Sequence, residues 1–64
     1  MALGRRVRGL RHAHEWTQER LAEESDLDRS YIAGIEMGSR NPSLNALDRL
    51  AQAFRLSLAE LFKF

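Results

Sequence analysis

The sequence predicts an all-α domain of five short helices, and three observations support this prediction. Apolar residues recur at three- and four-residue intervals along most of the chain, the spacing that places side chains on one face of a helix. Residues that cap helices stand just before four of these stretches. No Val/Ile/Thr run alternates with polar residues, and no Asn-Gly or Asp-Gly pair marks a hairpin. A chain of 64 residues is long enough for one domain, expected over residues 1–64.

A first helix is expected over residues 2–14. Its apolar positions share one face: Leu3, Val7 and Leu10. Three arginines are expected on a solvated or phosphate-steering face: Arg5, Arg6 and Arg8. Gly4 and Gly9 should weaken this helix, by about 1 kcal/mol each relative to alanine.

A second helix is expected over about 17–24. Thr17 is its N-cap, because a hydroxyl can accept a hydrogen bond from a free N–H of the first turn. Trp16 before the cap and Leu21 after it have the spacing of a hydrophobic staple. The polar pair that follows residue 24 ends the helix.

A third helix is expected over residues 29–37. Asp28 is the N-cap candidate, since its carboxylate would lie at the positive end of the helix dipole. Ile32 and Ile35 are expected in the core, and Gly38 is placed to end the helix in a left-handed conformation.

Two further helices complete the chain. Ser43 caps a fourth helix, whose apolar residues recur at helical spacing: Leu44, Leu47, Leu50, Ala51 and Phe54. Ser57, followed three residues later by Glu60, forms a capping box for a short last helix.

The charge is nearly balanced overall but unevenly distributed. Ten Lys and Arg residues stand against nine Asp and Glu, and nine of the ten are Arg. Residues 1–20 carry five arginines and two glutamates, whereas residues 21–41 carry five acidic residues and two arginines. This distribution allows a basic patch on one face, which is typical of nucleic-acid binding. A solvated, arginine-rich helix surface gives the same pattern and stays open as the alternative.

Composition and spacing exclude several functional classes. Without cysteine, neither disulfides nor thiolate zinc sites are expected. No apolar run approaches the ~18 residues of a membrane span and no signal peptide is evident, which indicates a cytoplasmic protein. His12 and His14 would point about 200° apart on a helix, so they cannot share a ligand. Because nucleophile motifs and Gly-rich phosphate loops are also missing, we expect no enzyme activity, cofactor or metal.

The segment 17–38 has the spacing of a helix-turn-helix, two short helices joined by a three- or four-residue turn. In that motif the second helix lies in the major groove and presents its N-terminal residues to base edges. Arg29 and Ser30 occupy those positions. Three residues are placed to reach phosphates: Thr17, Gln18 and Tyr31. Spacing alone leaves an alternative open, because any bundle of short helices contains a capped helical hairpin.

Residues 10–62 closely resemble the Cro/repressor-type (XRE) helix-turn-helix family. The matching pieces are LR at 10–11, WTQERLAEES at 16–25, LDRSYIAGIEMGSRNPS at 27–43, and ALDRLAQAF with LSLAELF behind them. The resemblance implies a lambda-repressor-like, five-helix DNA-binding domain. Such a domain acts as a transcriptional regulator, usually as a dimer on a palindromic operator. The segment DRSYIAGIE most resembles the controller proteins of restriction–modification systems, although repressors and antitoxins share most of the motif.

The resemblance also implies roles for individual residues. It places Gln18 against a phosphate and Arg11 in an ion pair with Glu36. It places three positions against base edges: Arg29, Ser30 and Gly34. Four residues would flank the DNA backbone: Ser39, Arg40, Asn41 and Ser43. The chain departs from the family at Gly34, which has no side chain to read a base, and at Met37, where a polar or basic residue is common.

The last segment, about 56–64, is unusually apolar for the end of a chain and is expected to complete the core and form a dimer interface. The candidate interface residues are Leu58, Leu61, Phe62 and Phe64. The expected partners are double-stranded DNA and a second copy, with no membrane and no small-molecule effector. A protein-interaction module, such as an antitoxin or adaptor on the same scaffold, stays open as an alternative function. So does a domain of a longer regulator.

Overall fold

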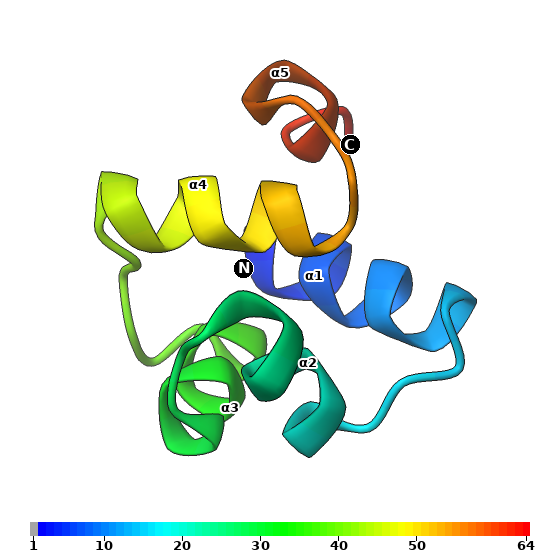
Figure 1. Cartoon of the computed structure of the whole chain (residues 1–64). Helices are drawn as coiled ribbons and strands as arrows, with labels where there is room; N and C mark the ends of the chain where they lie inside the picture. Colours follow the sequence, from blue (N-terminus) through cyan, green and yellow to red (C-terminus); the bar gives the residue numbers. More distant parts are fainter. Residues whose placement is uncertain (1) are drawn as a thin grey trace.

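Five helices follow one another along the chain, connected by short turns (Figure 1). A computed structural model describes residues 2–64. The helices are α1 (Ala2–Ala13), α2 (Gln18–Ser25), α3 (Arg29–Met37), α4 (Leu44–Ala53) and α5 (Leu58–Leu61). Residues 2–64 contain no strand. The prediction of an all-α fold with five helices is confirmed, and the bounds of the first three helices agree to within one residue.

In the view of Figure 1, α1 crosses the middle of the molecule. In this view α4 and α5 lie above it, and α2 and α3 lie below it. α3 packs against both α1 and α2, while α4 packs against α2 and α5. The pair α2–α3 is therefore held from two sides, by α1 and by α4.

Every helix contributes to one core. Six side chains are fully buried: Val7, Leu21, Ile32, Ile35, Leu50 and Leu61. Ala51 and Phe54 join this cluster, and partly buried residues such as Trp16 pack against it. Most of the apolar residues expected to share the inward face of a helix therefore belong to the core or pack against it. Leu44 is the exception: it begins α4 and is 72% exposed.

Three of the four expected N-caps make their hydrogen bonds. The hydroxyl of Thr17 accepts from the Arg20 N–H at 3.0 Å, and that of Ser43 accepts from the Ala46 N–H at 3.1 Å. At α5 the capping box is complete, since Ser57 and Glu60 each accept from the other's backbone N–H. The Ser57 backbone N–H, and then its side chain, hold the pKa of Glu60 below its ordinary value.

Asp28 is the exception among the predicted caps. It occupies the N-cap position of α3 with extended backbone angles, but its side chain makes no capping hydrogen bond. The side chain is exposed to solvent, so its contribution is limited to the electrostatic attraction of a carboxylate for a helix N-terminus.

A left-handed residue follows each of the first four helices. Gly38 has φ 78° after α3, as expected, and its N–H donates to the Ile35 carbonyl at 3.1 Å. Three residues with side chains take the same conformation, with φ near 58°: Glu15, Asp26 and Arg55. They follow α1, α2 and α4. These three positions are not predictable from residue type, because a left-handed conformation costs a residue with a Cβ about 1–2 kcal/mol.

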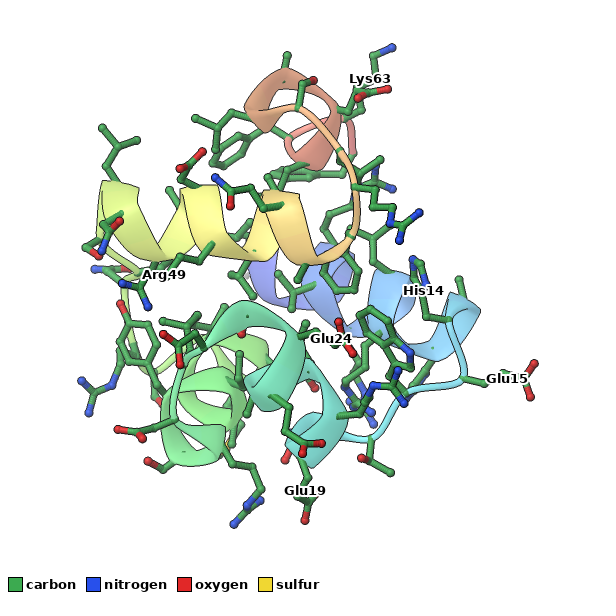
Figure 2. All side chains as sticks on the ribbon, viewed as in Figure 1. His14, Glu15, Glu19, Glu24, Arg49 and Lys63 are labelled. Carbon is green, nitrogen blue, oxygen red and sulfur yellow. The ribbon has the colours of Figure 1, made fainter. Side chains whose placement is uncertain are left out.

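An aromatic cluster closes the junction between α1 and α2. The ring centroid of Trp16 lies 4.5 Å from that of His14 and 5.8 Å from that of Phe54. Figure 2 shows His14 at the end of α1 that leads into this junction. The guanidinium of Arg20 lies 5.5 Å from the Trp16 ring on the same cluster. Trp16 is therefore a structural residue, held by rings from two elements.

Gly4 makes a close contact between α1 and the end of α3. A Cβ built on Gly4 would lie 2.5 Å from the Ile35 carbonyl oxygen and 2.8 Å from that of Glu36. At Gly9 a Cβ would meet nothing within 4 Å. The expectation that both glycines merely weaken α1 is thus wrong for Gly4, because the missing side chain lets the two helices approach.

This difference predicts opposite effects of one substitution at two positions of the same helix. Gly4→Ala should lower the free energy of unfolding by about 1–3 kcal/mol, because backbone atoms of α3 must move. Gly9→Ala should raise it by up to about 1 kcal/mol through helix propensity. Urea unfolding followed by circular dichroism measures both, and a stabilised Gly4→Ala variant would contradict the close contact.

Candidate nucleic-acid interface

The pair α2–α3 is joined by a turn over residues 26–28. Asp26 is left-handed, and the Leu27 N–H donates back to the Ala22 carbonyl at 3.1 Å. Arg49, on α4, donates to both the backbone and the side-chain oxygens of Asp26, at 3.1 and 3.2 Å. Figure 2 shows Arg49 on the side of α4 that faces this turn. The turn is therefore bound to a third helix, a contact that no local sequence pattern predicts.

The residues predicted to contact DNA surround the start of α3. Six of them are exposed: Thr17, Arg29, Ser30, Ser39, Arg40 and Asn41. Ser43, the cap of α4, is also exposed, whereas Gln18 and Tyr31 are half-buried. Two sets of contacts bring these residues together, one through Gln18 and one through Tyr31.

The first set runs from the surface inward through hydrogen bonds between side chains. Arg29 Nη1 donates to Gln18 Oε1 at 3.2 Å, and Gln18 Nε2 donates to Glu36 Oε1 at 3.3 Å. Glu36 in turn accepts from Arg11. The two residues predicted to read a base and to contact a phosphate, Arg29 and Gln18, are therefore connected to the interior of the fold.

Arg11 and Glu36 form the predicted ion pair with two hydrogen bonds. Arg11 Nε lies 2.8 Å from Glu36 Oε2, and Nη2 lies 3.0 Å from Oε1. The side chains are only 11% and 4% exposed. The hydrogen bond with Glu36 raises the pKa of Arg11, although partial burial opposes it. Since Arg11 Nη1 also donates to the Trp16 carbonyl at 2.9 Å, this side chain fixes α1, α3 and the start of α2 together.

The second set of contacts joins α3 to the loop and helix that follow it. The Tyr31 hydroxyl accepts from the Ser43 backbone N–H at 3.1 Å. The guanidinium of Arg40 lies 5.1 Å from the centre of the Tyr31 ring, in cation–π geometry. These residues, with Ser30 and Arg49, line part of an open hollow of about 340 Å³. Two arginines and two serine hydroxyls line the hollow, together with the carboxylates of Asp26 and Asp28. Because Arg49 is paired with Asp26, the groups left to bind phosphate oxygens are Arg40 and the two hydroxyls.

Gly34 has a packing role that the sequence did not indicate. Its carbonyl oxygen accepts from the backbone N–H groups of Ser39 and Arg40, at 3.0 and 3.2 Å, and from the Ser39 hydroxyl at 3.3 Å. A Cβ at Gly34 would lie 3.1 Å from the Cβ of Arg40. The absence of a side chain thus lets the loop fold back over α3, which brings Arg40 to the ring of Tyr31.

The structure divides the residues predicted to form a dimer interface. Leu61 is fully buried and belongs to the core, so the prediction that it lies at an interface is wrong. Leu58 is half-buried and packs on the same core. Phe62 and Phe64 are 44% and 65% exposed, with their ring centroids 6.1 Å apart. Only this aromatic pair offers substantial apolar surface in the segment.

Within residues 2–64, no group of three or more His, Asp or Glu side chains is placed to hold a metal ion. None of the five described helices combines the length and the apolar character needed to cross a membrane.

Comparison with known proteins identifies similar sequences. A family model described as helix-turn-helix matches residues 7–61. The chain is 38% identical over 61 residues to the immunity repressor protein of Bacillus phage phi105, and 40% identical over 62 residues to the competence pilus inhibition repressor of Acinetobacter baylyi. These alignments cover 95% and 97% of the chain but only 42% and 56% of the two repressors, so the chain spans about half their length. Control protein C.BamHI of Bacillus amyloliquefaciens is 37% identical over 65 residues, which cover the whole chain and 80% of that protein.

Solved structures agree with these sequence matches. The restriction-modification controller protein C.AhdI from Aeromonas hydrophila is 48% identical and superposes with a TM-score of 0.90, over 94% of this chain and 91% of its own. The SinR protein/SinI protein complex contains a chain that is 26% identical, with a TM-score of 0.88 over 95% of this chain and 60% of its own.

Proposed function

Since the chain belongs to the helix-turn-helix family of DNA-binding transcriptional regulators, we propose that it binds a palindromic operator as a homodimer and controls transcription there. The chain aligns with most of the length of two similar proteins, C.BamHI and C.AhdI. Both are named as control or controller proteins. This supports a controller-type role for the chain. Such a regulator acts where DNA is, in the cytoplasm.

The observation that carries the proposal is the start of α3, where two polar side chains project from a helix that is fixed from behind. Arg29 and Ser30 are exposed there, and the buried pair of Arg11 and Glu36 holds α3 against α1. We assign base contacts to Arg29 and Ser30, because a rigid helix can present them to the major groove. Gly34 can contribute only through its backbone.

Phosphate contacts are assigned to the residues on either side of α3. At the start of α2 these are Thr17 and Gln18. On the other side they are Tyr31, from the first turn of α3, and four residues between α3 and α4: Ser39, Arg40, Asn41 and Ser43. Such contacts fix the position of the protein on the duplex but carry no sequence information themselves. The hydroxyls and amides of this set supply donors, and Arg40 supplies the positive charge.

The homodimer follows from the size of the reading helix. α3 has nine residues, so one copy reaches only about three or four base pairs, too few to select one site in a genome. Two copies related by a two-fold axis double the contacts when their reading helices lie about 34 Å apart, one turn of DNA. We assign the interface to the surface formed by Phe62 and Phe64, called here the aromatic end.

Selection of bound sequences from random DNA tests the proposal. An enriched palindrome, shifted in electrophoresis with two copies of the chain per duplex, is the expected result. If no sequence is enriched and DNA is bound only weakly at low salt, the protein-interaction module becomes the better explanation. An enriched site that is not palindromic would retain DNA binding but remove the homodimer.

The aromatic end gives a separate prediction about assembly. Phe62→Ser should yield a folded monomer, with a dimer dissociation constant raised about thirtyfold or more, as for a central aromatic residue of an interface. Sedimentation equilibrium measures the constant, and circular dichroism confirms the helices. Leu61→Ser is the contrasting variant: its side chain is fully buried, so it should unfold the chain instead. If Phe62→Ser remains a tight dimer, the interface lies elsewhere.

A further inference from the structure

The last turn of α5 is held by a side chain from the other end of the sequence. Arg6, on α1, donates from Nη2 to the Glu60 carbonyl at 2.8 Å and from Nε to the Leu61 carbonyl at 3.2 Å. The last carbonyls of a helix lack partners within it, and a cation there also interacts favourably with the helix dipole. Arg6 therefore acts as the C-terminal cap of α5.

α5 needs such external support. It has only four residues, and so short a helix is not stable by itself in water. The capping box of Ser57 and Glu60 fixes its first turn, Leu61 anchors it in the core, and Arg6 fixes its last carbonyls. Phe62 follows directly after these carbonyls, so its position depends on them.

The helix that carries Arg6 is also the helix that holds the reading helix. Arg11 binds Glu36 of α3, and Gly4 lies against the carbonyls at the end of α3. In Figure 1, α1 lies between α5 above and α3 below. One path from the aromatic end to the reading helix therefore runs through Arg6 and α1. A second path runs through α4, which packs against both α5 and α2.

We propose that Arg6 is the positioning residue of the self-association surface, and that it sets the spacing between the two reading helices of a dimer. The proposal rests on the homodimer proposed above. Arg6 acts through α5: when its two hydrogen bonds are absent, the aromatic end samples several positions, and only the fraction in the correct position can associate. The apparent dissociation constant is divided by that fraction.

Three variants of the full chain test the proposal by sedimentation equilibrium. Arg6→Ala should raise the dimer dissociation constant about tenfold, the effect of losing a hydrogen bond to a charged group. Arg6→Lys keeps the charge but not the forked pair of donors, so its dimer dissociation constant should lie between those of the unmutated chain and Arg6→Ala. Arg8→Ala is the matched control, because Arg8 is an exposed arginine of the same helix and should change the constant less than twofold.

A second measurement separates positioning from general stability. Amide hydrogen exchange should become faster at residues 62–64 in Arg6→Ala, with the amides of α3 unchanged. When one base pair is inserted between the half-sites of the selected operator, the unmutated protein should lose much of its affinity for that DNA, and Arg6→Ala should lose less. Affinity for a single half-site should be the same for both.

The outcomes distinguish this proposal from the one on which it rests. If the unmutated chain is monomeric at tens of micromolar, the homodimer is refuted and the role of Arg6 with it. If the chain is dimeric and Arg6→Ala has the same dimer dissociation constant as the unmutated chain, only the role of Arg6 is refuted. The same holds if Arg8→Ala raises that constant as much as Arg6→Ala does. If Arg6→Ala loses its helical circular dichroism signal, the dimer dissociation constants of Arg6→Lys and Arg8→Ala are compared instead. A constant raised in Arg6→Lys but not in Arg8→Ala supports the role of Arg6, and equal constants refute it.

Discussion

Glu36→Ala is expected to leave much of the chain unfolded at 25 °C. Its carboxylate, with 4% of the side chain exposed, accepts two hydrogen bonds from Arg11 and one from Gln18. Removing one partner of a buried ion pair costs about 3–5 kcal/mol, because the other charge is left without a partner. The total stability of a domain of this size is only a few kcal/mol. Urea unfolding followed by circular dichroism gives the loss.

The double variant tests whether the two side chains interact. Arg11→Ala should destabilise the fold as Glu36→Ala does, and combining the two should recover part of the summed losses, since no unpaired charge remains. The exposed pair of Arg20 and Glu24 provides the control, with side chains 53% and 38% exposed. Glu24→Ala should cost no more than about 0.5 kcal/mol; Arg20 is left in place because its guanidinium also lies over the Trp16 ring. Strictly additive losses at Arg11 and Glu36 would show that their pairing contributes nothing.

Arg29→Ala should weaken binding to the selected operator by about 1–3 kcal/mol and remove the preference at one base position, most simply a guanine. The planar guanidinium can donate two parallel hydrogen bonds to guanine, and no other side chain exposed at the start of α3 can replace it. Fluorescence anisotropy on the operator, on its single-base variants and on random DNA measures the change. An equal loss on all sequences would make Arg29 a phosphate contact.

Arg40→Ala is the matched comparison for Arg29→Ala. Both variants remove one positive charge beside α3. A phosphate contact at Arg40 should weaken the operator and random DNA alike, and should make the dependence of log K on log salt shallower by about one unit. A change in base preference at Arg40, with an unchanged salt dependence, would assign it to base contacts instead.

The features predictable from the sequence are those encoded within a few residues. Helix starts are predicted by cap residues that act within one turn: Thr17, Ser43 and the capping box of Ser57 and Glu60. Together with the apolar spacing, these caps define the five helices. The ion pair of Arg11 and Glu36 is different, because 25 positions separate the two residues. Only the resemblance to a family indicated that pairing.

What the sequence did not reveal are contacts between distant segments. Arg6 and the end of α5 are 54 and 55 positions apart, and no local pattern marks an arginine that caps another helix. In the sequence Gly4 cannot be told from any other glycine within a helix, because its role depends on the backbone of α3 that packs against it. Leu61 ends a helix of a single turn and Phe62 follows it, and so short an element has no periodicity to show which of the two faces inward.

The aromatic cluster at the junction of α1 and α2 gives the chain an internal spectroscopic label. Trp16 is the only tryptophan, and it lies against His14 and Phe54, with its carbonyl bound by Arg11. Its fluorescence therefore comes from a single environment and changes when that junction opens to water. Fluorescence can be read at concentrations far below those of circular dichroism, so unfolding of the single copy can be followed where dimers have dissociated. Folding and association can thus be measured separately on the unmodified chain.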